Sequence, residues 1–202
     1  MRYSLTALMI LTGFMAFSQN DFRIQINDTI FDISHNTEYN ITLDGKPLKF
    51  KVIAKDTLVY DDDLFSFQYS KDYKISSTKL DEGIEQLMLM TAEGTGVLIQ
   101  KYSTINPTVV NEMMLSEVTK ESIGYGFKMT RKDYTRKLKS GLKLEVDKAV
   151  LTYRGETNIY EVASIGKGSE GIVIMTMIMD EKAGEQGQKI IDMMWNSLTF
   201  KR

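Results

Sequence analysis

Apolar and polar residues alternate along much of the chain with a period of two, which is typical of a strand that buries one face. Residues 22–26 (FRIQI) and 65–70 (FSFQYS) show this alternation clearly. Asp44-Gly45 lies between two such runs and predicts a hairpin, because both central residues of a two-residue turn adopt positive φ. Further strands are predicted at residues 30–33, 39–43, 46–54, 97–102, 128–138, 142–154 and 157–166, and residues 73–77 are expected to be extended. The apolar run 171–180 is too short for a membrane span and predicts a core strand. The apolar run 84–91 is ambiguous between strand and helix, and we interpret it as a strand.

Two segments have the helical period instead. Over residues 109–123 apolar side chains recur four apart at Val110, Met114 and Val118, while polar residues face the other way. A second helix is predicted over 184–197. Its buried stripe would consist of Ile190, Ile191, Met194, Trp195 and Leu198. Short turns join consecutive strands, so we expect an α+β fold: a mostly antiparallel sheet with two packed helices.

The first eighteen residues have the pattern of a secretory signal peptide. Arg2 precedes an apolar run over residues 5–17, and Ala16 and Ser18 are the small residues expected before a cut ahead of Gln19. This run is shorter than the roughly 17 to 25 residues of a membrane-spanning helix, although an uncleaved anchor is the alternative. We therefore expect a secreted or periplasmic protein that is cut between Ser18 and Gln19 and has no transmembrane segment afterwards.

The remaining chain is expected to contain a small β-rich segment at residues 19–60 and an α/β domain at residues 61–202. The pattern leaves open whether the first segment folds independently or adds strands to the main sheet. Asp61-Asp62-Asp63 separates the two parts and lacks the spacing of a calcium loop, so we interpret it as a solvated link. The glycine-rich runs 93–96 and 166–168 lack a phosphate-binding frame and indicate hairpin turns.

Composition narrows the possible chemistry. The chain has no Cys and one His among 202 residues, which excludes disulfides and thiolate sites and argues against a histidine metal cluster. His35 lies in a polar run without a catalytic motif, so we expect a surface loop residue. With 25 basic and 27 acidic residues the net charge is −2, which argues against nucleic acid as a partner. We expect no cofactor, no metal and no enzymatic activity.

From Leu64 to the end the chain resembles the PsbP-like α/β sandwich family, which includes the DcrB type. The resemblance is carried by the aromatic strand 65–70, the helix 109–123, the apolar strand 171–180 and the closing residues 194–200 (MWNSLTF). Ser70 departs from it, since the family often has proline there. The family's members are mostly adaptor, assembly or binding proteins without a shared active site. The resemblance therefore implies a sandwich fold for residues 64–202 and assigns no functional residue. Residues 22–60 lie outside it, and their strand pattern predicts an N-terminal β extension.

The strongest charge asymmetry lies between residues 131 and 143, where Asp133 is the only acid. In a strand, Lys132, Tyr134 and Arg136 would point to one side and the residues between them to the other. Such a surface could bind an acidic partner, an anionic glycan or lipid head groups. The alternative is a solvated hairpin whose lysines protect a sheet edge. The candidate partner-binding residues are Arg131, Lys132, Tyr134, Arg136, Lys137, Lys139 and Lys143.

We interpret the chain as a non-enzymatic binding or assembly module whose partner, a protein or envelope component, is unknown. One alternative is a carrier of an apolar or lipid-like ligand, which needs a cavity lined by the core methionines. These would be Met88, Met114, Met177 and Met194. The other alternative is an envelope hydrolase, which needs two carboxylates that converge in a cleft.

Overall fold

The computed structural model describes residues 22–43, 45–180 and 185–201. The signal peptide expected at residues 1–18 lies outside the described residues, as does Gly184 at the expected start of the last helix. The chain divides into two compact units between Lys55 and Asp56. No helix in the described ranges is long and apolar enough to cross a membrane.

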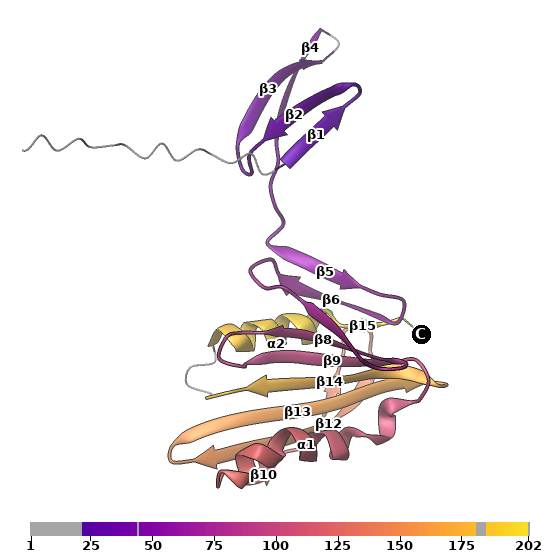
Figure 1. Ribbon diagram of the computed structural model, residues 1–202, viewed down its shortest axis with the longest axis vertical. Coiled ribbons are helices and arrows are strands. Elements are labelled where there is room, and N and C mark those ends of the chain that lie inside the picture. The colour runs from indigo at the N-terminus through magenta and orange to yellow at the C-terminus, as the bar shows by residue number, and fades with distance from the viewer. Residues whose placement is uncertain (1–21, 44, 181–184, 202) are drawn as a thin grey trace, which may run out of the picture. The chain divides into compact units, whose positions relative to one another are not determined.

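The first unit consists of two hairpins (Figure 1). Strand β1 (Phe22–Ile26) pairs with β2 (Thr29–Ile33), and β3 (Glu38–Leu43) pairs with β4 (Lys46–Lys51). The predicted strands of this segment are thus confirmed. Only Ile33 is fully buried among the described residues of the unit, so it has little core of its own.

The second unit contains an eight-stranded sheet in the order β10-β12-β13-β14-β9-β8-β7, in which β11 also pairs with β12. All of its pairs are antiparallel. Its strands are β7 (Ser76–Asp81), β8 (Ile84–Met90), β9 (Gly96–Tyr102), β10 (Lys128–Arg131), β11 (Tyr134–Lys137), β12 (Lys143–Tyr153), β13 (Glu156–Lys167) and β14 (Glu170–Ile178). A three-stranded sheet runs in the order β15 (Thr199–Phe200), β6 (Phe65–Ser70) and β5 (Thr57–Asp61).

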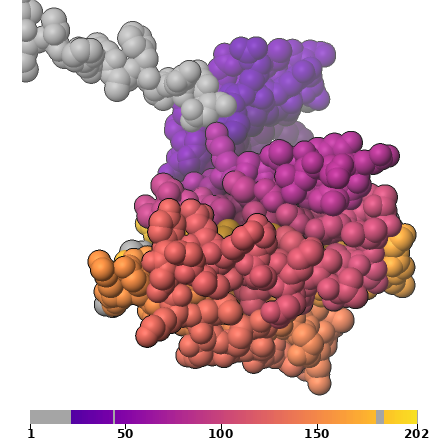
Figure 2. Space-filling view, turned by 60° about the horizontal axis from the view of Figure 1, so that its bottom comes forward, coloured from indigo at the N-terminus to yellow at the C-terminus, as the bar shows by residue number. Residues whose placement is uncertain are grey.

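Two helices cover opposite faces of the large sheet (Figure 1). Helix α1 (Asn111–Gly124), preceded by the short 3-10 helix η1 (Pro107–Val109), packs against β12 and β13, and α2 (Glu185–Ser197) packs against β6 and β9. In Figure 2 the atoms of α1 lie in the outer layer of this unit. The alternation along each strand divides the side chains between two cores: Ala163 belongs to the core beneath α2 and Val162 to the core beneath α1. The α+β fold with a mostly antiparallel sheet is therefore confirmed.

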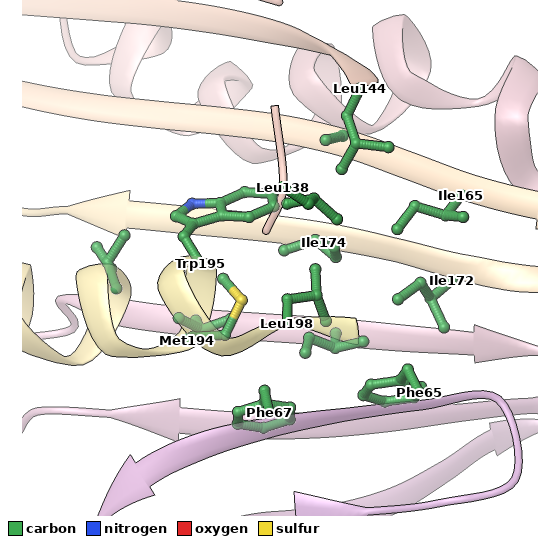
Figure 3. Close-up of a cluster of buried hydrophobic side chains, with 14 of the residues drawn as sticks. Phe65, Phe67, Leu138, Leu144, Ile165, Ile172, Ile174, Met194, Trp195 and Leu198 are labelled. Carbon is green, nitrogen blue, oxygen red and sulfur yellow. The ribbon is translucent and has the colours of Figure 1, made fainter. Parts of the chain in front are cut away.

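The core beneath α2 lies between the two sheets. Figure 3 shows Met194 of α2 and Leu198, which follows the helix, between β6 and β14, while the Trp195 ring lies next to Leu138. All of these side chains belong to one buried cluster with Phe65 and Phe67 of β6. The predicted stripe of α2 is confirmed, because its five members are all buried. The members are Ile190, Ile191, Met194, Trp195 and Leu198.

Several elements differ from the prediction. Strand β5 was not predicted, and most of it falls in the segment 19–60; it pairs with β6 and belongs to the second unit. The single strand expected at 128–138 is two short strands, β10 and β11, because the chain leaves the ladder around Asp133, whose side chain accepts from the Lys148 backbone N–H at 2.8 Å. In α1 the fully buried residues are Leu115 and Thr119. The predicted apolar stripe of α1, Val110, Met114 and Val118, is only half-buried.

Candidate functional site

The seven candidate residues of the cationic segment lie on β10, β11 and the start of β12 and in the two links between these strands. Strand β11 keeps the predicted alternation, since Tyr134 and Arg136 are half-buried and Lys137 is exposed. Register pairs Arg136 with Leu144, and Leu144 belongs to the core beneath α2. Tyr134 and Arg136 therefore point to the α2 face, and Lys137 points to the α1 face.

Arg131 is surrounded by acidic side chains. Its guanidinium donates to Glu112 of α1 at 2.7 Å and to Asp133 at 3.0 Å, and it lies 3.2 Å from Asp147 of β12. The hydrogen bonds to Asp133 and Glu112 raise the pKa of Arg131 well above its ordinary value. These contacts tie α1 to the sheet, and the charge of Arg131 is balanced by acids within the fold.

Four lysines of the segment remain exposed: Lys132, Lys137, Lys139 and Lys143. In the part of the chain that the structure describes, none of the four forms an ion pair. Lys137 stands directly opposite Lys143 in the β11–β12 ladder, and Lys139 lies in the turn between them. Like charges in directly opposed positions destabilise a strand pair, so this arrangement costs the fold some stability.

A cavity of about 630 Å³ lies on the α2 face, between the first half of α2 and strands β11 to β14. At its floor is Glu161, which is 6% exposed. Its Oε1 accepts from Lys148 Nζ at 2.9 Å, and its Oε2 accepts from the Tyr134 hydroxyl at 3.0 Å. The lining residues are Tyr134, Arg136, Lys148, Ile159, Glu161, Thr176, Ile178, Glu185, Gln188, Lys189 and Ile191.

Arg136 forms the wall of this cavity nearest to the core. Its guanidinium lies 4.7 Å from the centre of the Trp195 ring system and 5.5 Å from that of Tyr134, and its Nη2 donates to the Tyr134 hydroxyl at 2.7 Å. Burial, followed by the nearby charge of Glu161, raises the pKa of Tyr134. Tyr134 therefore stays a neutral donor to the carboxylate.

The hydrolase alternative needs two carboxylates in a cleft, and Glu161 and Glu185 both line this cavity. Both oxygens of Glu161 already accept hydrogen bonds, and Arg136 Nη2 lies 3.8 Å from one of them. Such an arrangement compensates a buried charge, whereas a general acid or base needs a carboxylate that can reach the substrate. Among the described residues no group of three or more His, Asp or Glu is placed to hold a metal ion.

The sequence did not single out Glu161, Lys148 or Trp195 as site residues. A signal was present, because Glu161 interrupts the apolar alternation of 157–166 at a position that faces the core. A buried acid needs a cationic partner. The partner, Lys148, is set by the pairing of β12 with β13, which the sequence could not supply.

The four methionines proposed for a ligand cavity do not meet. Met194 belongs to the core beneath α2, whereas Met114 and Met177 pack against the core beneath α1. Met88 is 37% exposed. The sheet separates the two groups, so the prediction of one cavity lined by all four is wrong.

The prediction of a solvated link at Asp61-Asp62-Asp63 is also wrong. Lys101 Nζ donates to Asp62 and to Asp63, each at 2.6 Å, and Lys201 Nζ pairs with Asp61 at 2.6 Å. The triplet thus fastens the start of the second unit to β9 and to the C-terminal segment. His35 lies in an exposed loop, as predicted. The two glycine-rich hairpin turns are confirmed by the pairing of β8 with β9 and of β13 with β14.

No protein-family model matches the chain, and no curated protein matches its sequence. Solved structures give a likeness in fold. The solution structure of cyanobacterial PsbP (CyanoP) from Synechocystis sp. PCC 6803 aligns with a TM-score of 0.47 at 12% identity, covering 72% of this chain and 93% of that one. A crystal structure from Bacteroides thetaiotaomicron VPI-5482 aligns with a TM-score of 0.35 at 11% identity, covering 73% of this chain and 48% of that one. The likeness concerns the fold alone.

Proposed function

We propose that this chain is a non-enzymatic binding module of the cell envelope, which captures an acidic partner protein through the tip of the β11–β12 hairpin. The observation that carries the proposal is the opposition of Lys137 and Lys143, with Lys139 in the turn between them. We call these three residues the hairpin cations. Lys132 lies beyond the other end of β11 and extends the positive surface.

The proposal rests on how the neighbouring acids are used. Asp133 and Asp147 lie against Arg131, and Glu161 is held by Lys148. Glu145, opposite Thr135, accepts from the threonine hydroxyl at 3.0 Å. Asp133, Asp147 and Glu161 are thus engaged by other cations. Glu145 stays charged beside the hairpin tip, but three hairpin cations against this one carboxylate still leave the surface positive. Positive potential at an exposed site favours and orients encounters with an acidic surface.

The envelope location rests on the signal-peptide pattern of residues 1–18. A secreted module without Cys cannot form disulfides, so its hydrophobic core must stabilise the fold. The second unit has two such cores. The observation that Glu161 is compensated on all sides supports a binding role over the hydrolase alternative.

The test is quantitative crosslinking in envelope extract with protein tagged at its C-terminus. Wild type is compared with the variant Lys137→Glu, Lys139→Glu, Lys143→Glu and with the control Lys74→Glu, Lys128→Glu, Lys167→Glu, which carries the same charge change at other exposed lysines. We expect one stoichiometric partner that is lost in the hairpin variant, retained in the control and released by salt. Equal capture by all three proteins would refute the proposal.

A further inference from the structure

The three-stranded sheet has one edge on which no described strand lies. Its order is β15-β6-β5, so β5 pairs with β6 on one side only (Figure 1). Exposed strand edges are usually protected in natural proteins, because their free N–H and C=O groups can pair with another chain. Lysines, irregular pairing and very short strands are the common means of protection.

The other edges of the second unit are protected in these ways. Strand β7 contains Lys79 and a shift of register next to it. Strands β10 and β11 carry cations and are separated by a break, and β15 has only two residues. Strand β5 has none of these features, because its register with β6 is continuous and its one charge, Asp61, is its last residue.

The backbone groups that face the open edge belong to alternate residues of β5. Asp62 N–H donates to Phe65 O, so the even-numbered residues of β5 are those that bond to β6. In an antiparallel pair such residues alternate with residues whose backbone groups face the other way. Thr57, Val59 and Asp61 thus direct their N–H and C=O groups toward the open edge. None of these groups has a backbone partner among the described residues.

The side chains of β5 divide between the two faces of its sheet. Leu58 and Tyr60 face inward, and Tyr60 packs against the core beneath α2. A cavity of about 590 Å³ lies beside them and is lined also by Tyr69 and Tyr73. Val59 faces outward and is 59% exposed. The open edge therefore combines unpaired main-chain groups with uncovered apolar surface.

A second copy of β5 fits this edge in antiparallel register. When Val59 stands opposite the partner's Val59, Thr57 stands opposite the partner's Asp61 and Leu58 opposite the partner's Tyr60. The residues with outward backbone groups then face one another, so each outward N–H meets a C=O. No like charges are opposed, and apolar side chains of one copy meet apolar side chains of the other, as in stable strand pairs.

We propose that this protein forms a two-fold symmetric dimer in which β5 pairs with the β5 of a second copy. The pairing joins two three-stranded sheets into one continuous sheet. Both copies use the same surface, so the assembly closes at two copies. A second copy is favoured over an unrelated segment because β5 is complementary to itself in the register that pairs all five of its residues. The hairpin cations lie on the other sheet, so the dimer does not depend on partner capture.

Sedimentation velocity of the purified protein over a range of concentrations tests the proposal. We expect a monomer–dimer equilibrium in wild type and monomer alone in Val59→Lys, which opposes two like charges at the symmetry axis. The matched control is Met113→Lys on α1, because Met113 is 61% exposed and Val59 is 59% exposed. This control should dimerise as wild type does. A wild type that is monomeric at every concentration, or equal dimerisation of the three proteins, overturns the proposal.

A second pair of variants tests whether the backbone of β5 forms the contact. Val59→Pro removes the N–H that faces the open edge and leaves the hydrogen bonds between β5 and β6 in place. Val59→Thr keeps that N–H and a β-branched side chain. We expect dimerisation to be lost in Val59→Pro and kept in Val59→Thr, with circular dichroism showing that both variants fold. If Val59→Pro folds and still dimerises, the contact lies elsewhere and the proposal fails.

A disulfide tests the register even if Val59→Pro does not fold, because the chain has no Cys of its own. Residues opposed in a hydrogen-bonded antiparallel pair have Cα atoms about 5.5 Å apart, which a disulfide can span. Val59→Cys should therefore give a covalent dimer on mild oxidation. Thr57→Cys is the control and should stay unlinked, since about 13 Å of strand would separate its two copies. Equal crosslinking of both variants, or no covalent dimer of Val59→Cys, overturns the proposal.

Discussion

The two faces of the eight-stranded sheet are covered by helices that are buried to different depths. Helix α2 buries its whole apolar stripe, and Met194 is 0% exposed. Helix α1 buries only Leu115 and Thr119 completely and leaves Met113 largely in solvent. Both helices were predicted from the same kind of periodicity, so the pattern alone does not set the depth of burial.

The second sheet explains the difference. Strand β6 lies against α2, and its backbone N–H at Gln68 donates to Ser197 Oγ at 2.7 Å. Helix α2 is thus enclosed on two sides, whereas α1 packs mainly on β12 and β13 of the sheet beneath it. The enclosed face holds the cavity with Glu161, and the α1 face carries the hairpin cations where no helix covers them.

The largest expected effect on stability comes from comparing a methionine of α2 with a methionine of α1. Met194→Ala should lower the free energy of unfolding by about 3 kcal/mol, because it leaves a cavity in an enclosed core. Met114→Ala on α1 should cost about 1 kcal/mol, because that side chain is only partly buried. Urea unfolding monitored by circular dichroism measures both. An equal cost at the two positions would contradict the comparison.

The next effect concerns how closely α2 approaches the sheet. A Cβ on Gly187 would lie 1.9 Å from Thr95 Cγ2, and Thr95 is fixed by the hydrogen bond that its Oγ1 accepts from the Met179 N–H at 2.9 Å. Gly187→Ala should therefore destabilise the protein by about 1 to 2 kcal/mol, despite the better helix propensity of alanine.

The control for this prediction lies on the other helix. A Cβ on Gly124, at the end of α1, would have no atom within 4 Å. Gly124→Ala should leave the midpoint of thermal unfolding unchanged or slightly raised. If Gly187→Ala were as well tolerated as Gly124→Ala, the close approach of α2 would not be a constraint.

A smaller effect is expected in acid, at the contact of Asp63 with β9. The hydrogen bond from Lys101 holds the pKa of Asp63 well below its ordinary value. Its contribution to stability is therefore complete above the unfolded pKa of about 3.9, and it is lost as the pH falls through the lower folded value. Lys101→Met should lose less stability than wild type between pH 7 and pH 2.

Urea unfolding at several pH values measures this dependence. The difference should be below about 1 kcal/mol, since Asp63 is largely exposed and solvent screens the pair. Lys167→Met, at an exposed lysine outside the contact, should keep the wild-type pH profile. A profile for Lys101→Met identical to that of wild type would show that the triplet does not act through Lys101.

The smallest effect is expected at the hairpin cations. Lys143→Glu places opposite charges across the β11–β12 ladder and should stabilise the fold by about 0.2 to 1 kcal/mol. Lys143→Gln should give roughly half of that gain. If Lys143→Glu left the stability unchanged or lowered it, the Lys137–Lys143 pair would not destabilise the fold. The pair would then no longer support a binding role for the hairpin cations.

Much of the fold could be predicted from the chain itself. The period of two placed most strands, and the apolar stripe of α2 identified its buried side chains, because both patterns follow from local backbone geometry. The two-residue strand β15 was missed, since Thr199 and Phe200 are too short a run to show a period. The break between β10 and β11 was missed because it depends on Asp133 accepting from a backbone group of another strand.

The candidate site divides in the same way. The sequence by itself located the cationic segment and placed Tyr134 and Arg136 on one side of a strand, since alternation is a local property. Lys132, expected on the same side, lies in the link between β10 and β11 instead. Only the tertiary structure decided which charges stay exposed. Arg131 is neutralised by acids from α1 and β12, and Glu161 is compensated by Lys148 from the adjacent strand. Such pairings join residues far apart in the chain, so strand order and helix packing determine them, and no local pattern contains them.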